Sequence, residues 1–368
     1  MRCSGCGVEL QHEDPEEMGY LPESVLESRL QAGKEIMCRR CFLIKHYSSL
    51  PENDSVSHTL DNLNEYLKLA REVIYVIDIS DFDGTYRKDI SQLLKNHSVH
   101  YVLNKIDLLP KEVKVEEIRE WASDIIKEPV SRVRPVSVLG KYGLNSLYAY
   151  LKSVAEEFVS IGVTNVGKSS LLNGLMRSEE IIVSRFPGTT VEVASKTLKN
   201  SAVTVYDTPG IFTNDRLTDL MSTEDQSRLL ARKRLKKSTF QFHDVRTVFL
   251  GGFVKIDAKN QSDPVGIFHT FVPESVSVHE TNPNTAAKEW DSWFGDILRP
   301  PFDRSKRGKY RWEAKEFRLH TGQELHICGL GWINVAKGPL TIGLTRPKNV
   351  ALKVRKGLVG PKKFKKNR

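Results

Sequence analysis

The sequence predicts an α/β fold preceded by a short cysteine-bearing module and followed by a strand-rich C-terminal part. Between His58 and Thr213, short apolar runs alternate with amphipathic helical stretches, which is typical of a doubly wound sheet. Two C-x-x-C pairs precede this region, and beyond about Lys237 the apolar pattern is mostly that of strands. A chain of 368 residues has room for two or three such units, and we place them at 1–50, 51–215 and 216–368.

Each expected element follows from its own apolar pattern. The expected strands of the α/β part are Val73–Ile79, Val99–Asn104, Val133–Ser137, Phe158–Ile161, Val191–Thr197 and Val203–Tyr206. The expected helices are Val115–Lys127, Leu144–Glu157, Lys168–Met176 and the charged stretch Arg216–Lys237. The C-terminal strands are expected at Val245–Ile256, Ile267–Phe271, Leu325–Val335 and Leu340–Lys353.

The composition indicates a water-soluble globular protein. Hydrophobic residues make up 39% of the chain and charged residues 27%, which allows a sizeable core. The longest apolar stretch, around Val73–Ile79, is far too short to cross a bilayer, and there is no sign of a secretory signal. We therefore expect a cytoplasmic protein that makes no membrane contact and is monomeric when free.

The segment Gly162–Ser169 fits the pattern G-x-x-x-x-G-K-[ST] without a mismatch. It lies between a strand-like run and a helical run, which is the context that a phosphate-binding loop needs. Lys168 is expected to reach the β- and γ-phosphates, and Ser169 to bind Mg²⁺ through its hydroxyl. The expected nucleotide contacts in and directly after this loop are Gly162, Asn165, Val166, Gly167, Lys168, Ser169 and Ser170.

Two further elements follow the loop at the expected places. Asp207-Thr208-Pro209-Gly210 comes after a strand, where its carboxylate can hold Mg²⁺ through water and Gly210 can offer a backbone N–H to the γ-phosphate. Between the loop and this motif lies Phe186–Thr190, from which a threonine hydroxyl could complete the Mg²⁺ shell. Thr189 and Thr190 are both candidates for a catalytic role, and we take Thr190 as the magnesium ligand.

Asn104-Lys105-Ile106-Asp107 predicts selection of guanine. The Asp107 carboxylate can accept hydrogen bonds from N1–H and the exocyclic amine of guanine, and adenine would leave this acceptor unpaired. Asn104 is expected to bond the base and tie the loops together, and the Lys105 stem to lie over the ring. Ser137 and Val138 fit the last nucleotide-contacting position at the end of the next strand, although an alanine is usual where Val138 stands.

The order of these motifs is unusual, because the guanine motif precedes the phosphate loop. This order resembles that of the circularly permuted GTPases of ribosome assembly, and a cysteine-bearing N-terminus in front of it resembles the YqeH family. The resemblance covers the full chain. It implies a circularly permuted P-loop GTPase domain that binds GTP or GDP and hydrolyses GTP slowly. It further implies small ribosomal subunit biogenesis and a C-terminal domain similar to a tryptophan-responsive RNA-binding protein.

Two residues bear on how GTP would be hydrolysed. Ile211 stands where Ras-like proteins place a water-orienting glutamine, and an isoleucine cannot orient water. Asn165 matches the asparagine that binds potassium in GTPases with such a hydrophobic replacement, so the resemblance implies a K⁺ ligand there. A hydrogen bond that only stabilises the loop is the alternative for Asn165.

The paired cysteines predict a structural zinc site. Cys3, Cys6, Cys38 and Cys41 can close a tetrahedral shell of thiolates around Zn²⁺. The spacer between the pairs is longer than that of common zinc ribbons, so iron–sulfur ligation and redox disulfides stay open as alternatives. Cys328 lies in an apolar run and is interpreted as a core residue.

The basic charge is concentrated at the end of the chain. Of the net charge of +9, eight positive charges lie between Lys353 and Arg368 without an acidic residue, so the rest of the chain carries only +1. Such a tail suits ribosomal RNA or small-subunit assembly intermediates, and a solubilising tail is the plain alternative. Tyr310-Arg311-Trp312 could stack RNA bases or form the edge of a core.

These observations favour a GTPase switch that acts on a ribosomal precursor. The segment after Gly210 leaves the sheet and leads into the C-terminal part, so we expect GTP to change RNA or ribosome affinity through this connection. An RNA-binding scaffold with a nucleotide site and little turnover is the second hypothesis, and Ile211 supports it. A GTPase that modifies RNA is disfavoured, because the sequence offers no second catalytic constellation.

Overall fold

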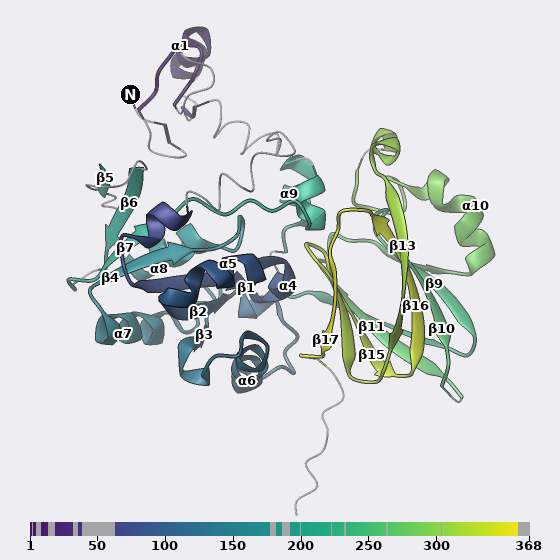
Figure 1. Cartoon of the computed structure of the whole chain (residues 1–368). Coiled ribbons are helices and arrows are strands. Elements are labelled where there is room, and N and C mark those ends of the chain that lie inside the picture. The colour runs from purple at the N-terminus through teal and green to yellow at the C-terminus, as the bar shows by residue number, and fades with distance from the viewer. Residues whose placement is uncertain are drawn as a thin grey trace, which may run out of the picture.

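The structure is a computed structural model of the whole chain (Figure 1). The residues that it describes are 1, 3–4, 9–13, 19–31, 36–38, 63–176, 182–185, 192–198, 200–221, 223–231, 233–262, 264–302 and 304–359. In this part of the chain, a mixed β-sheet with surrounding helices, called the α/β sheet below, is followed by two further β-sheets.

The α/β sheet has seven strands in the order β3-β2-β1-β4-β7-β6-β5. Five of them pair in parallel: β1 (Glu72–Asp78), β2 (Ser98–Asn104), β3 (Val133–Pro135), β4 (Glu157–Ile161) and β7 (Thr204–Asp207). The antiparallel edge is formed by β6 (Glu192–Thr197) and β5 (Ile182–Arg185). β1 and β2 are buried along nearly their whole length, as strands covered on both faces are, and this explains their continuous apolar pattern.

Helices pack around this sheet and complete its core. The long ones are α6 (Val115–Ile126), α7 (Leu144–Val154) and α8 (Lys168–Met176). Short helical segments follow β1, namely η1 (Ile79–Asp81), α4 (Phe82–Thr85), α5 (Lys88–Leu93) and η2 (Leu94–Asn96). Single turns η3 (Ile106–Leu108) and η4 (Val130–Arg132) adjoin β2 and β3. Ile118 of α6, Leu147 of α7 and Leu171 of α8 join the strands in one buried cluster.

Two C-terminal sheets of five strands each follow, in the orders β12-β9-β10-β16-β13 and β17-β14-β15-β11-β8. The first contains β9 (Val245–Leu250), β10 (Val254–Asn260), β12 (Val278–Thr281), β13 (Trp312–Leu319) and β16 (Leu340–Pro347). The second contains β8 (Lys236–Phe242), β11 (Gly266–Val272), β14 (Gln323–Ile327), β15 (Gly331–Lys337) and β17 (Leu352–Lys356). Val248 of the first and Ile333 of the second lie in one buried cluster, as expected for packed sheets.

Several expected elements have different bounds. The helix expected at Leu144–Glu157 ends at Val154, because Ala155 is extended and Glu157 already begins β4. The helix expected at Arg216–Lys237 is wrong: this stretch holds the turn η5 (Leu217–Leu220), the short helix α9 (Thr223–Leu229) and the start of β8. Polar side chains of this stretch bind other parts of the molecule, as described below for Arg216, and do not form the exposed face of one continuous helix.

Three of the expected C-terminal strands each contain parts of two strands. Val245–Ile256 is divided between β9 and β10 by a turn at Gly251, which has a φ of 57° that favours glycine. Leu325–Val335 is likewise divided between β14 and β15 by a turn that contains Gly329, with a φ of 79°. Leu340–Lys353 contains β16 and the start of β17. Trp290 and Trp293 belong to a helix, α10 (Pro283–Trp293), and η6 (Arg304–Lys309) precedes β13.

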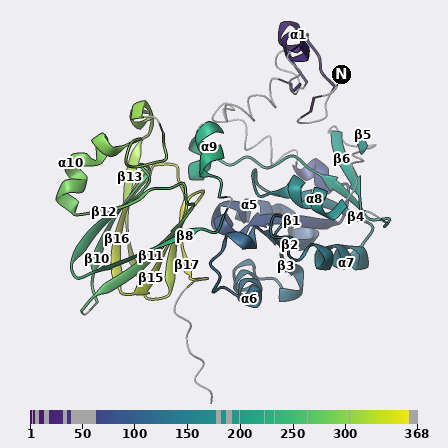
Figure 2. The same cartoon turned by 180° about the vertical axis from the view of Figure 1, so that it is seen from behind.

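The α/β sheet and the C-terminal sheets lie side by side (Figures 1 and 2). Contacts between α4 and β17 and between α6 and β17 join them, through Arg355 to Asp83 and through the Trp121 indole N–H to the Lys356 carbonyl at 2.9 Å. Near the N-terminus, α1 (Glu23–Gln31) packs against a small buried cluster that includes Cys3 and Cys38. Across the residues that the structure describes, none of the helices combines the length and apolar character that crossing a bilayer requires.

Candidate nucleotide-binding site

The carboxyl ends of the parallel strands bring the sequence motifs to one edge of the α/β sheet. Asp78 at the end of β1 lies directly opposite Asn104 at the end of β2, and Asp207 ends β7 beside β4. The loop that follows β4, residues 162–167, leads straight into α8. This edge is where open α/β sheets bind their ligands.

Asn104 ties the guanine motif to the phosphate loop. Its side-chain amide donates to the Val166 carbonyl at 2.9 Å, and Asn104 is only 2% exposed. Gly167 faces this amide with a φ of 87°, and a Cβ at this position would stand 2.5 Å from the Asn104 amide nitrogen. The close approach explains why the loop needs glycine at Gly167.

Lys105 takes part in the same connection in a way that the sequence does not predict. It has a left-handed backbone, and its ammonium donates to Asp78 and to the Asn165 carbonyl, both at 2.6 Å. Asp78 also accepts from the backbone N–H and the hydroxyl of Ser80. Asp78 was not among the expected site residues, although its place at the carboxyl end of a buried strand is a signal that could have found it.

Asp107 and Ser137 meet where β2 and β3 end. The Ser137 hydroxyl donates to the Asp107 carboxylate at 2.5 Å, while it accepts from the Gly140 N–H at 2.7 Å. These two bonds orient the carboxylate that is expected to receive the guanine N–H groups. Val138, the neighbour of Ser137, packs against the core of the α/β sheet.

Lys168 lies deep in the site and is only 7% exposed. Its ammonium contacts the Asp207 carboxylate and the Thr208 carbonyl. Burial lowers the pKa of Lys168 from its ordinary value, and the attraction of Asp207 opposes this effect. A second buried lysine, Lys196 of β6, lies 3.7 Å from the other oxygen of Asp207 and was not predicted from the sequence. Two ammonium groups thus converge beside the loop that is expected to hold phosphates.

The Asp207–Gly210 motif is bonded to the phosphate loop by backbone groups. Ile211 donates to the Gly162 carbonyl and accepts from the Thr164 N–H, both at 2.9 Å, so the two segments pair like parallel strands. Gly210 packs on Thr164, whose Cα would stand 3.2 Å from a Cβ at Gly210. The Ile211 side chain is 3% exposed and belongs to the core, which gives a physical reason why it cannot position an attacking water.

Two family models match the chain. Residues 157–254 match the model described as 50S ribosome-binding GTPase, and residues 266–358 match the model described as YqeH-like, C-terminal. The chain belongs to the YqeH-like GTPases. It is therefore a GTP hydrolase of a ribosome-binding family.

The YqeH-like GTPase is also similar to curated relatives over most of its length. It is 29% identical to the uncharacterized protein YqeH of Bacillus subtilis over 97% of this chain and 99% of the relative. It is 24% identical to NO-associated protein 1, chloroplastic/mitochondrial, of Arabidopsis thaliana over 95% of this chain and 72% of the relative. Among solved structures, it is similar to GDP-bound YlqF, with a TM-score of 0.31 and 21% identity over 45% of this chain and 62% of that one.

The remaining expected site residues of the YqeH-like GTPase fall into two groups. Ser169 and Ser170 lie exposed in the first turn of α8, next to the phosphate loop, and Asn165 has a left-handed backbone with a φ of 68°. Those that lie outside the described residues are Thr189, Thr190, Cys6 and Cys41.

The described cysteines are compatible with half of a thiolate site. Cys3 and Cys38 are 2% and 1% exposed, and the Cys38 backbone N–H donates to the Cys3 sulfur at 3.1 Å. An N–H donor of this kind stabilises a thiolate more than a thiol, because the negatively charged sulfur is the better acceptor. This arrangement fits a sulfur bound to zinc. It fits iron–sulfur ligation or a redox-active thiolate equally well. Cys328 is 1% exposed, as expected for a core residue.

The described part of the basic tail belongs to the C-terminal sheets. Lys353, Arg355 and Lys356 belong to β17, and Arg355 bonds the buried Glu324 at 3.1 Å as well as Asp83. The expectation that the whole tail contacts RNA is therefore corrected for Arg355. Tyr310 and Trp312 pack with Trp290 and Phe294 in an aromatic cluster, over which Arg307 lies 4.3 Å from the Trp290 ring centroid. This favours the core-edge interpretation of these two residues.

Proposed function

We propose that this YqeH-like GTPase is a GTP-driven switch that acts on small ribosomal subunit precursors in the cytoplasm. The observation that carries the proposal is the segment after Gly210. It is bonded to the phosphate loop through Ile211, and six residues later Leu217 donates to the Cys328 carbonyl of the C-terminal sheets at 2.8 Å. A change at the γ-phosphate therefore has a short covalent and hydrogen-bonded route to the part expected to bind RNA.

A circular permutation accounts for this wiring. The match to the GTPase model begins at residue 157, directly at β4, and leaves the guanine motif at 104–107 in front of it. β1, β2 and β3 precede the phosphate loop in the chain, yet they lie beside β4 in the same sheet. We place the domain boundaries at 50/51 and 215/216, so that the segment after Gly210 becomes the connection between two domains.

The roles of the site residues follow from their positions. Asn104, Lys105, Asp107 and Ser137 would hold guanine, and the phosphate loop with Lys168 would hold the phosphates. Ser169, Asp207 and Thr190 would hold Mg²⁺, which supplies charge neutralisation between the phosphates when it is bound. Asn165 would hold K⁺, and Cys3, Cys6, Cys38 and Cys41 would hold a structural Zn²⁺.

Guanine selection is tested by Asp107→Asn. The variant should lose about a hundredfold or more in GTP affinity, because a donor amide replaces one carboxylate acceptor, and it should gain affinity for xanthosine triphosphate, which offers a carbonyl there. Unchanged GTP affinity would remove Asp107 from the site.

The potassium assignment of Asn165 is tested by measuring GTP hydrolysis in K⁺ and in Na⁺. Equal turnover in the two salts contradicts the assignment.

The ribosomal partner is tested by co-sedimentation with purified small and large subunits, with GDP and with a non-hydrolysable GTP analogue. Tighter binding to small subunits that depends on the nucleotide supports the proposal. Binding only to large subunits, as the family description suggests, would overturn the small-subunit role.

The alternative function is an RNA-binding scaffold with little turnover. The buried Ile211 supports it, and it predicts that assembly particles do not accelerate GTP hydrolysis.

A further inference from the structure

Arg216 is a buried arginine that none of the nucleotide motifs includes. It is 4% exposed and lies five residues after Ile211, at the start of η5. One edge of its guanidinium faces the phosphate loop: it donates to the Thr164 carbonyl at 3.2 Å and to the Thr164 hydroxyl at 2.9 Å. Thr164 is the loop residue on which Gly210 packs.

The remaining contacts of the guanidinium are with acidic groups and with the turn that contains Arg216. It donates to Asp219 at 2.7 Å and to the Thr213 hydroxyl at 2.9 Å, and it lies 3.8 Å from an oxygen of Asp81. Thr213 in turn donates to Asp219 at 2.5 Å. These bonds use the planar set of five donors that only arginine has, so a lysine cannot reproduce them.

The acidic partner Asp81 reaches the C-terminal sheets. Its carboxylate accepts from the Gly329 N–H at 2.8 Å, and Gly329 lies in the turn between β14 and β15. On both sides of Arg216 the backbone contacts the same sheets: Ala351 donates to the Asp215 carbonyl, and Leu217 donates to the Cys328 carbonyl, both at 2.8 Å. Arg216 therefore stands between the phosphate loop and one particular turn of the C-terminal part.

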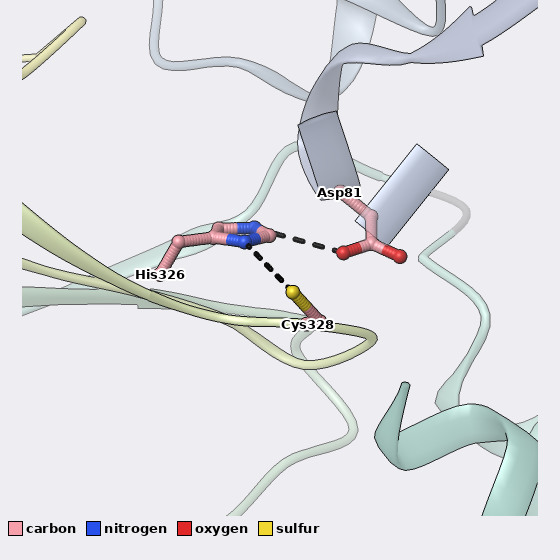
Figure 3. A group of neighbouring side chains, drawn as sticks. All are labelled: Asp81, His326 and Cys328. Atoms are coloured by element: carbon pink, nitrogen blue, oxygen red, sulfur yellow. Dashed lines mark hydrogen bonds and ion pairs between the residues drawn. The ribbon is translucent and has the colours of Figure 1, made fainter. Parts of the chain in front are cut away.

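Asp81, His326 and Cys328 lie close together in this interface (Figure 3). Asp81 lies 3.7 Å from Nε2 of His326, whereas the Cys328 sulfur lies 3.8 Å from Nδ1, so the two face opposite nitrogens of one ring. An ion held by either nitrogen would not meet both of the other groups in a normal shell. Burial also raises the pKa of the Cys328 thiol well above its usual range, which opposes thiolate ligation. The group is thus better explained as interface packing.

We propose that Arg216 is a positioning residue that couples the phosphate loop to the C-terminal sheets. By holding the carbonyl and the hydroxyl of Thr164, it fixes the position of the loop against Gly210, whose N–H is expected to reach the γ-phosphate. Through Asp81 and Gly329, it passes a movement of Gly210 to the turn between β14 and β15. This inference rests on the proposed switch function, and it names the side chain through which the switch acts.

The test is Arg216→Lys, with Arg87→Lys as the matched control. Arg87 also pairs with carboxylates at this interface, at 2.7 Å from Asp215 and 3.1 Å from Asp89, but it contacts no residue of the phosphate loop in the described structure. Arg216→Lys should lower kcat for GTP about tenfold while GDP affinity changes less than about threefold, because positioning is lost and binding is kept. Arg87→Lys should leave kcat within about twofold. A comparable fall of kcat in both variants would show a structural role alone.

A double-mutant cycle with Thr164→Val tests the contact itself. Valine keeps the methyl that packs on Gly210 and removes the hydroxyl that accepts from Arg216. The double variant should be no slower than Arg216→Lys alone, because both changes remove one interaction. Additive losses in kcat would overturn the assignment of Thr164 as the contact through which Arg216 acts.

Hydrogen exchange at the Leu217 and Gly329 amides tests the coupling in the isolated full-length protein. In the wild type, exchange should differ between GDP and a non-hydrolysable GTP analogue, and Arg216→Lys should abolish the difference. Persistence of the difference in Arg216→Lys, or its absence from the wild type, would overturn the proposal. Failure to bind small subunits would instead overturn the ribosomal role, and this exchange experiment does not depend on that binding.

Discussion

The nucleotide edge of the α/β sheet and its interface with the C-terminal sheets use charged residues in opposite ways. At the nucleotide edge, Lys105 and Asp78 keep 22% and 10% of their side chains exposed and Lys168 keeps 7%, and these charges lie beside the loop that is expected to hold phosphates. At the interface, Glu324 and His326 are fully buried, and Arg355 retains only 6% exposure. The comparison teaches that charge serves ligand binding in the first region and fixed attachment in the second.

The largest expected effect separates activity from stability at the nucleotide edge. Lys168→Ala removes the ammonium that is expected to meet the phosphates, so kcat should fall about a thousandfold. Stability to denaturant should change little, since Lys196 still lies 3.7 Å from the Asp207 carboxylate. Steady-state GTP hydrolysis and urea unfolding measure the two quantities. A large loss of stability with modest loss of activity would reverse the comparison.

The interface should show the reverse pattern. Arg355→Met leaves the buried Glu324 and Asp83 without their arginine, and the free energy of unfolding should fall by about 3 kcal/mol or more. Urea unfolding of the full chain measures this, and GTP affinity should be nearly unchanged. Lys353→Met is the matched control, because Lys353 lies exposed on the same strand and should change stability by less than about 0.5 kcal/mol.

Ile211→Gln tests whether the missing glutamine can simply be restored. The Ile211 side chain points into the core, so a glutamine would bury an amide without a partner and destabilise the fold by about 2 kcal/mol. Hydrolysis should not become faster than in the wild type. A clear rise in kcat would show that this side chain reaches the nucleotide, and the core position would then be wrong for the working enzyme.

The smallest expected effect is a pH dependence of the interface. Burial raises the pKa of Asp81 to about 7, against the opposing attraction of Arg216, so the folded protein binds a proton that the unfolded chain releases near pH 4. Asp81 therefore contributes stability at low pH that is lost as the pH rises through about 7, by on the order of 1–2 kcal/mol.

Asp81→Asn should remove this dependence, which is measured by urea unfolding at several pH values. His326 acts in the opposite sense, because burial lowers its pKa to about 4 and its contribution grows as the pH rises from about 4 to 6.5. The wild-type minus Asp81→Asn difference isolates the Asp81 part. An equal slope in both proteins would show that Asp81 stays ionised in the interface.

The sequence was most informative where local rules apply. The strands around the motifs were located within a few residues, and Lys168–Met176 was predicted with the observed bounds. These predictions succeeded because a phosphate loop needs glycines and a helix start in one short stretch. The prediction failed for Arg216–Lys237, where a run of charges suggested a helix and the residues instead form a turn, a short helix and a strand.

By itself, the sequence predicted the chemistry of nucleotide binding, because the residues expected to surround guanine and the phosphates stand in short motifs with fixed spacing. Only the tertiary structure decided which of the other charges meet. Asp78 joins Lys105 across two strands, and Arg216 joins Thr164 and Asp219 to a turn more than a hundred residues away. Such contacts depend on how the strands are ordered and how the two parts pack, and no local pattern records them.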